Sequence, residues 1–429
     1  MRPFLLLPEI ILFIGGLASL IGGSFLPRQR QWAARVVAMA ALLAAGTVSA
    51  IDLGRSAITA FDGSFAVDMA TGVVRLLVGL ATLLVVFLAA DEMRDSPRES
   101  ETYALLLFSA TGTQLLAGAN DLLVLAVAFL LASIPLYGLI GLACTPAAAE
   151  AALKTYLLGA LFGILLLAGV TLLYGLAGST AYAEVGASLH EGPSGVVALG
   201  AVAVFGGLMF KAGGVPAHFW VPDAAQGANA TAATFLTTVP KIGALVAVYR
   251  LVVTLGDTVA SGGLLAALAV LSMTLANFAA YWQTDPRRLL GYSTVSQLGY
   301  LLVPAVVAGR SELALPSLLF YLAAYAVTNV AAFAVTASLP GSRDLDPYRG
   351  LARREPLLTA ALVVALLPGG HAANGRLRRQ GHDGDRRLGR RLRVAGPRRP
   401  GQHRGQPLLL PALDRVGVPA GRPQPGAIG

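Results

Sequence analysis

Long apolar stretches recur along most of this chain, and each is long enough to cross a hydrocarbon core of about 30 Å. The first apolar stretch continues to Leu26. It is longer than the apolar region of a cleavable signal peptide, so we expect a membrane helix there. A twelfth stretch begins near Pro356 and stops after Leu367. Eleven complete stretches are expected near residues 4–26, 32–53, 68–90, 102–118, 121–143, 153–177, 196–221, 232–252, 260–282, 293–308 and 313–338. The sequence therefore predicts an all-α, polytopic transmembrane helix bundle.

The composition agrees with a membrane protein. Charged residues make up 13% of the chain and hydrophobic residues 55%, whereas a soluble domain carries about 25% charged residues. The single cysteine, Cys144, excludes an internal disulfide and a cysteine-ligated iron–sulfur cluster or zinc knuckle within this chain. We therefore expect no cofactor and no metal site in it.

Basic residues alternate between successive connections, which predicts how the chain crosses the membrane. By the positive-inside rule, the richer set faces the cytoplasm and the N-terminus lies outside, in an inner or plasma membrane that the chain crosses many times. The linker 178–195 is then expected to be an external loop, and Arg75 is expected to snorkel to the outer interface. The richer set comprises Arg28, Arg30, Arg35, Arg94, Arg98, Lys154, Arg287, Arg288, Arg343, Arg349, Arg353 and Arg354, and the poorer set Arg2, Arg55, Arg250 and Arg310.

The net charge of +9 belongs to the C-terminal end alone. Residues 371–429 hold 13 arginines, three aspartates and no lysine, whereas the preceding 370 residues hold 19 basic and 20 acidic groups. We therefore divide the chain into a helical domain, 1–368, with eleven complete helices and part of a twelfth, and an Arg/Gly/Pro-rich tail, 369–429. The tail is either a disordered basic segment that meets anionic lipid or nucleic acid, or a displaced reading frame of GC-rich DNA, which we favour. No nucleic-acid partner is expected.

The chain has only three lysines, and two of them, Lys211 and Lys241, lie deep in apolar sequence. A lysine at bilayer depth costs about 2.5–3.5 kcal/mol on insertion scales, so its presence there calls for a function. A lysine removed from water loses its preference for the charged form, which lets it take up and release protons. Between these two lysines lie residues that interrupt a helix, namely Gly213, Gly214, Pro216, His218 and Pro222.

An interrupted helix leaves free carbonyls at its C-terminal end, and these stabilise a transient ammonium. His218 suits a proton relay, since its unperturbed pKa is near 6.5, although a hydrogen-bonded structural histidine is an equal alternative. Lys241 follows Pro240, so a lysine that snorkels from a helix start is the alternative there. Asp223, after Pro222, is expected to be a helix cap. For Tyr292, Ser293 and Gln297, channel solvation and core hydrogen bonding are equal alternatives.

Several blocks of sequence resemble a known family. FKAGGVPAHFWVPDAAQGANA at 210–230, VPK at 239–241 and DPRRLLGYSTVSQLGY at 285–300 are similar to the proton-translocating subunits of respiratory complex I. These subunits are homologous to subunits of multi-component cation/proton antiporters. LLPEIIL at 6–12 and EAALKTYLLGA at 150–160 resemble in particular the subunit N family of bacterial NADH:quinone oxidoreductase. The resemblance covers about residues 4–368.

The resemblance implies a fourteen-helix bundle with two inverted five-helix repeats, each with a broken helix, of which the second repeat is incomplete here. It implies a proton path through Lys211 on the first broken helix, Lys241 on the next helix and Lys154 at the start of the sixth. It also implies a non-redox subunit, packed among other membrane-arm subunits in the lipid bilayer of a complex that uses NADH and quinone.

The sequence departs from the family in two places. The family has a glutamate in its fifth helix, three residues before a Ser-x-Pro, and Leu130 stands at that position here. The lysine of the second broken helix is also absent from the chain as given. Three alternatives therefore stay open beside the complex I subunit: a subunit of a cation/proton antiporter, a secondary transporter of a small solute, and a non-functional product cut after its eleventh helix.

Overall fold

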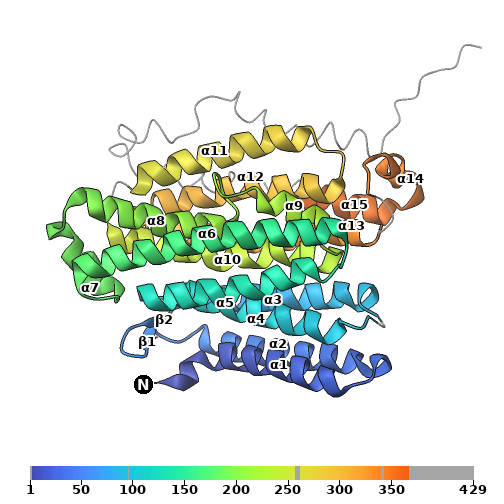
Figure 1. Ribbon diagram of the computed structural model, residues 1–429, viewed down its shortest axis with the longest axis horizontal. Helices are drawn as coiled ribbons and strands as arrows, with labels where there is room; N and C mark the ends of the chain where they lie inside the picture. Colours follow the sequence, from blue (N-terminus) through green and yellow to red (C-terminus); the bar gives the residue numbers. More distant parts are fainter. Residues whose placement is uncertain (1, 95, 257–260, 340–342, 367–429) are drawn as a thin grey trace, which may run out of the picture.

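The computed structural model describes residues 2–94, 96–256, 261–339 and 343–366, which form a bundle of long helices lying side by side (Figure 1). Eleven long helices overlap the eleven predicted stretches, although the seventh ends at Ala212 and not near residue 221. Ten of them are long and apolar enough to cross a membrane by length and composition, within the part of the chain described. The eleven are α1 (Leu7–Phe25), α2 (Trp32–Asp52), α3 (Met69–Glu92), α4 (Glu99–Gly118), α5 (Leu122–Gly141), α6 (Pro146–Ala177), α8 (Ser194–Ala212), α10 (Ala230–Leu255), α11 (Ser261–Tyr281), α12 (Pro286–Val306) and α13 (Ala314–Ala337).

Shorter elements connect the long helices. A hairpin of β1 (Ile58–Ala60) and β2 (Phe65–Val67) joins α2 to α3, with Ile58 opposite Val67. The linker 178–195, predicted to be an external loop, connects α6 to α8 and contains α7 (Tyr182–Ser188) and a 3-10 turn (Leu189–Glu191). The remaining short helices are α9 (Trp220–Gly227), α14 (Leu351–Arg354) and α15 (Pro356–Leu366), the last at the place of the predicted partial twelfth helix.

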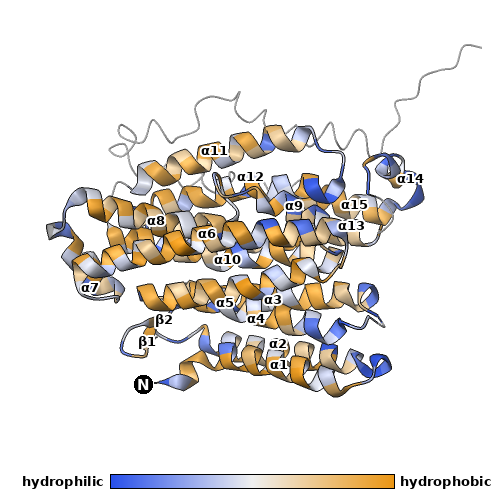
Figure 2. Cartoon of the chain, viewed as in Figure 1, coloured by the Kyte–Doolittle hydropathy of each residue, from blue (hydrophilic) through white to orange (hydrophobic). Residues whose placement is uncertain are grey.

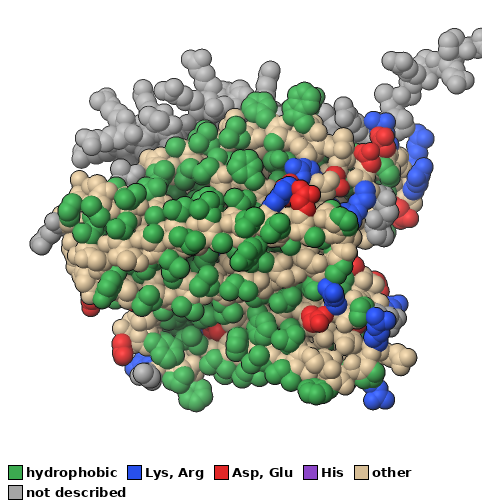
Figure 3. Space-filling view, viewed as in Figure 1, with side chains coloured by type: hydrophobic (Ala, Val, Ile, Leu, Met, Phe, Trp, Pro, Cys, Tyr) green, Lys and Arg blue, Asp and Glu red, His purple; other side chains and the backbone are tan. Residues whose placement is uncertain are grey.

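The surface of the bundle is apolar along the helices and polar at their ends. Figure 2 shows hydrophobic residues along most of each helix and hydrophilic ones near the turns and around α14. On the face drawn in Figure 3, hydrophobic side chains cover the middle, and most charged ones gather on the right-hand side. Large apolar side chains such as Ile164 and Phe278 are more than 60% exposed, on α6 and α11 respectively. Such a surface fits lipid or the apolar face of another subunit.

Two helices form the interior. Of the 26 residues of α10, 21 are buried, and the helix packs against α3, α4, α8, α9, α12 and α13. The other is α4. Of the eleven long helices it alone is not apolar enough to count as a membrane span by composition, and 16 of its 20 residues are buried. Gly112 allows this close packing, because a Cβ there would overlap the backbone at Ala132 of α5. Protein rather than lipid therefore surrounds the hydroxyl and amide groups of α4.

Arg75 does not snorkel to an interface, so that prediction was wrong. Its side chain is 1% exposed, and its Nε and Nη2 donate to the two carboxylate oxygens of Glu9 at 2.7 and 2.8 Å. Glu9 belongs to the LLPEIIL segment of α1, 66 residues earlier in the chain. The arginine stays in the interior because a bidentate carboxylate balances its charge there.

Candidate functional site

The predicted interruption of the helix is confirmed. Helix α8 ends at Ala212, and Gly213 adopts φ +80°, a conformation that favours glycine. The amides of Gly213 and Gly214 both donate to Met209 O at 2.9 and 2.8 Å, which closes the helix end. Helix α9 begins only at Trp220, whose Nε1 donates to Phe210 O at 3.0 Å. The polypeptide between α8 and α9 is thus held inside the bundle in a non-helical conformation.

Lys241 reaches the open end of α8. Its side chain is fully buried, and Nζ donates to Ala212 O, the carbonyl of the last α8 residue, at 2.7 Å. A Cβ at Gly213 would lie 2.8 Å from the same Nζ, so the missing side chain makes room for the amine. The C-terminal end of a helix carries partial negative charge, which favours the ammonium form. Since α10 begins at Ala230, Lys241 is not at a helix start and does not snorkel.

Lys211 lies in the last turn of α8 and is also buried, at 1% exposed. Its Nζ donates to Ser133 Oγ of α5 at 3.1 Å, and that hydroxyl donates to Phe129 O at 2.6 Å. Within the described residues no carboxylate forms an ion pair with Lys211. Both buried amines are therefore bound beside the break, and among the described residues the oxygens that bind them are neutral.

Comparison with known proteins shows the family of this chain. Residues 119–370 match a family described as NADH:quinone oxidoreductase/Mrp antiporter, transmembrane. NADH-quinone oxidoreductase subunit N of Mycobacterium sp. (strain JLS) is 65% identical over 367 residues, covering 86% of this chain and 78% of that protein. The chain belongs to the subunit N family of NADH-quinone oxidoreductase. A second relative, subunit N 1 of Streptomyces griseus, is 49% identical over 85% of this chain and 78% of its own.

Solved structures agree with the assignment to the subunit N family. A chain of respiratory complex I from Thermus thermophilus matches with a TM-score of 0.71 and 29% identity, over 95% of this chain and 96% of its own. A chain of the Mrp complex from Dietzia sp. DQ12-45-1b matches with a TM-score of 0.79 over 99% of this chain and 81% of its own. At 21% identity the second match concerns the fold alone, so the antiporter alternative is the weaker one. The predicted antiporter-like membrane fold is confirmed.

The family's carboxylate position points away from the lysines in this member. Leu130 is 41% exposed, whereas Ser133, three residues later on α5, faces Lys211 and is 1% exposed. Ser133 is thus the α5 residue that binds the amine in this chain.

His218 lies in the connection between α8 and α9. Its side chain is 8% exposed, and its ring centroid is 4.3 Å from that of Phe219. Nδ1 is buried and has no hydrogen-bond partner within the part of the chain described. The structure therefore places His218 beside the break, on neither helix that carries the buried lysines.

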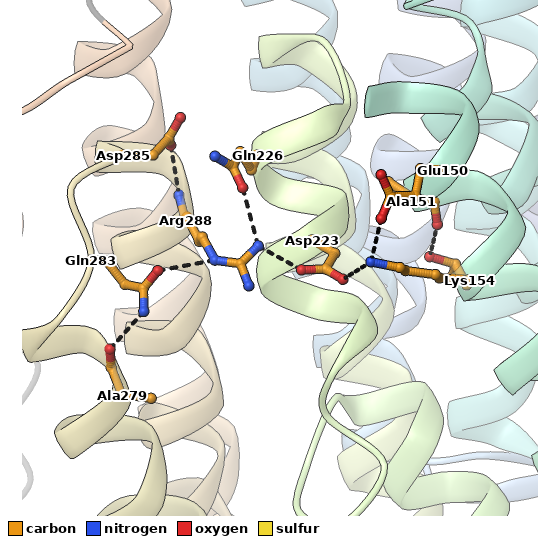
Figure 4. Close-up of polar contacts among 10 residues, drawn as sticks. Glu150, Ala151, Lys154, Asp223, Gln226, Ala279, Gln283, Asp285 and Arg288 are labelled. Atoms are coloured by element: carbon orange, nitrogen blue, oxygen red, sulfur yellow. Dashed lines mark hydrogen bonds and ion pairs between the residues drawn. The ribbon is translucent and has the colours of Figure 1, made fainter. Parts of the chain in front are cut away.

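Lys154 lies apart from the other two lysines. It is half exposed on α6, where Nζ contacts Glu150 at 2.6 Å and Asp223 at 3.1 Å (Figure 4). The other oxygen of Asp223 accepts from Arg288 at 2.5 Å. The N-cap of α9 is Phe219, without a side-chain cap, so the prediction that Asp223 caps a helix was wrong. Instead, Asp223 links α6, α9 and α12 through two cations.

The sequence interpretation missed a polar cluster one turn before Lys241. Asn329 of α13 donates to Thr237 Oγ1 at 3.0 Å and to Thr238 Oγ1 at 2.7 Å, and Tyr325 OH donates to Thr237 O at 2.5 Å. The paired threonines directly before Val-Pro-Lys were an available signal, because hydroxyls inside an apolar helix usually find a partner. This cluster fixes α10 against α13 close to the buried amine.

Two further polar predictions can be compared with the structure. Gln297 accepts a hydrogen bond from Tyr321 OH at 2.5 Å, and the guanidinium of Arg288 lies 5.9 Å from the ring centre of Tyr292. For Gln297 this is core hydrogen bonding.

Within the described residues no three His, Cys, Asp or Glu side chains come together as they would around a metal ion.

Proposed function

We propose that this chain is a proton-translocating, non-redox subunit of the membrane arm of NADH:quinone oxidoreductase. The observation that carries this proposal is the fully buried Lys241 amine on the terminal carbonyl of a broken helix. Hydride and electron transfer would occur on partner subunits, and this chain would move protons by changing the charge of Lys211 and Lys241.

The contacts of each lysine suit a reversible change of charge. Lys241 rests on a backbone carbonyl and Lys211 on a hydroxyl, and neither oxygen carries a full charge that would fix the amine as a cation. Ser133 can also reorient, since its hydroxyl both donates and accepts. When either amine releases its proton, its partner oxygen is therefore not left as an unpaired anion.

Coupling between the two lysines would be electrostatic. Both lie at the same break, Lys211 in the last turn of α8 and Lys241 on its terminal carbonyl, so a proton on one raises the cost of charge on the other. A change of charge imposed from a neighbouring subunit would pass through the chain in the same way.

His218 and Lys154 extend the proposed path. The unpaired Nδ1 of His218, beside the break, is available to a proton carrier such as water. Lys154 is half exposed and contacts two carboxylates, so it suits the cytoplasmic mouth of the path. In this arrangement the N-terminus lies outside, and the chain crosses the inner or plasma membrane many times among other membrane-arm subunits.

A vesicle experiment tests the proposal. In membranes with assembled complex, Lys211→Ala is expected to lower the number of protons moved per NADH oxidised, because one of the two buried charges is lost. Arg94→Ala is the matched control, since Arg94 pairs with Asp91 on the surface, where the two side chains are 71% and 90% exposed. An unchanged proton-to-electron ratio in the Lys211 variant would refute a proton-path role.

We further propose that residues 369–429 are read in a displaced frame. These residues lie outside the described part of the structure. Their composition changes where the match to the family model ends, at residue 370. Sequencing the gene around codons 366–372 and the expressed protein tests this; an intact frame with the Arg-rich tail present would end the idea.

A further inference from the structure

The ion pair between Arg75 and Glu9 lies away from the lysines and has no part in the proposed proton path. It joins α1 to α3, and Gln114 of α4 adds a third element by donating from Nε2 to Arg75 O at 3.2 Å. All three residues precede residue 119, where the match to the family model begins. Gly243 of α10 packs closely against the backbone of Thr113, the residue before Gln114.

The polar atoms of this group are not all satisfied by protein. Arg75 uses Nε and Nη2 on Glu9, and Nη2 also donates to Leu5 O at 2.9 Å. Its Nη1 is buried without a hydrogen-bond partner in the described residues, and so is Oε1 of Gln114. The Phe65 ring, 5.8 Å from Arg75 Cζ, offers only a weak cation–π contact. Because buried donors and acceptors are nearly always paired, both atoms call for a ligand.

A cavity beside Arg75 has the right size for a small ligand. Its volume is about 10 Å³, and its walls include Leu5, Asp52, Gly72 and Arg75. That is about the space one water molecule needs. A wider surface hollow of about 850 Å³, lined by Arg250 and Asn120 among others, shares Ile58 and Asp68 with it. The cavity thus adjoins a route from the surface.

We propose that the cavity beside Arg75 binds a buried water, which accepts a hydrogen bond from Nη1 of the guanidinium that is paired with Glu9. Water fits better than an ion, because Glu9 already balances the charge of Arg75. It also fits the unpaired Nη1, because a water oxygen accepts a hydrogen bond from an N–H donor. A hydrated pair is stable in the interior, where an ion pair with missing hydrogen bonds would be costly. The site stands independently of the proton path through the lysines.

The test uses the purified complex and electron microscopy at a resolution that shows water. Density within about 3.2 Å of Arg75 Nη1 is expected in the wild type. In Gly72→Ala the new methyl group enters the cavity wall beside Leu53, so this density is expected to be lost. Gly79→Ala is the control, because it makes the same change on α3 where nothing lies within 4 Å of the new Cβ, and there the density should remain.

Thermal release of the subunit gives a second measurement. If water satisfies Arg75, the Gly72→Ala complex should lose this subunit severalfold faster on heating than the Gly79→Ala complex. Because the new Cβ would also lie 2.7 Å from Leu53 Cδ1, the faster loss supports a bound water only where the density at Nη1 disappears with it. Wild-type density with no water at Nη1, or a water that Gly72→Ala leaves in place, would overturn the proposal.

Discussion

Breaking the buried ion pair should be one of the most damaging single changes in this chain. Glu9→Leu leaves the Arg75 guanidinium uncompensated in a place where the two side chains are 1% and 3% exposed. Removal of one partner of a buried pair costs about 3–5 kcal/mol. At about 1.4 kcal/mol for each factor of ten, the ratio of folded to unfolded protein falls by roughly two to three and a half orders of magnitude.

The same reasoning predicts a rescue. Replacing both partners, as in Glu9→Leu/Arg75→Met, removes the stranded charge and fills the space with apolar side chains, so stability should return to within about 1–2 kcal/mol of the wild type. The assay is the amount of this subunit retained in purified complex as temperature rises. Asp91→Ala, which breaks the surface pair with Arg94, should change nothing measurable. If the single and double variants are equally unstable, the stranded charge is not the cause and the reasoning fails.

Three other changes follow from the contacts. Gly243→Ala should destabilise the bundle by about 1–3 kcal/mol, because the new Cβ would overlap Thr113 O. Gly46→Ala is the control, since nothing lies within 4 Å of its new Cβ. Equal melting temperatures for these two variants would contradict the prediction. Asn329→Leu removes the donor of hydrogen bonds to the Thr237 and Thr238 hydroxyls and should lower the free energy of unfolding by about 1–3 kcal/mol, measured by thermal unfolding. An unchanged stability would show that these hydrogen bonds from Asn329 do not stabilise the bundle. Burial alone would raise the pKa of Asp68, but the hydrogen bond and charge of Arg250 outweigh it and hold that pKa below its ordinary value. The stabilisation from the ionised Asp68 carboxylate is therefore present at neutral pH and is lost as the pH falls through its lowered pKa. The difference in melting temperature between the wild type and Asp68→Asn should then narrow below about pH 4. A difference that widens there would contradict a lowered pKa.

The long helices could be predicted because each apolar run is local information. The break after Ala212 could be predicted for the same reason, since Gly213 and Pro216 act on their own backbone. Polarity does not exclude a helix in the linker 178–195, which is polar and contains α7. Helix α4 was predicted although it is poorer in apolar residues, and the structure shows that protein surrounds it. Composition reports the polarity of a segment, and only packing shows what surrounds it.

Partners distant in sequence could not be predicted from the chain. Glu9 and Arg75 are 66 residues apart, and nothing local to Arg75 distinguishes an inward ion pair from a snorkelling side chain. Lys211 and Ser133 are 78 residues apart, so the sequence could not show that the Ser133 hydroxyl binds the Lys211 amine. The sequence pattern of the family showed only that Leu130 stands where a carboxylate was expected. The resemblance to the family placed Lys154 in the same path as the other two lysines, and the structure shows it paired with Asp223, which also binds Arg288.

The proton-to-electron ratio of assembled complex carrying Lys241→Met is the most direct measurement of the central claim. Methionine keeps the length and apolar stem of the side chain but cannot hold a charge on Ala212 O. The account predicts that NADH oxidation continues while fewer protons are moved per electron pair, and that Lys154→Met, on the exposed cluster, reduces the ratio less. A Lys241→Met complex that assembles fully and moves as many protons per electron pair as the wild type would contradict it.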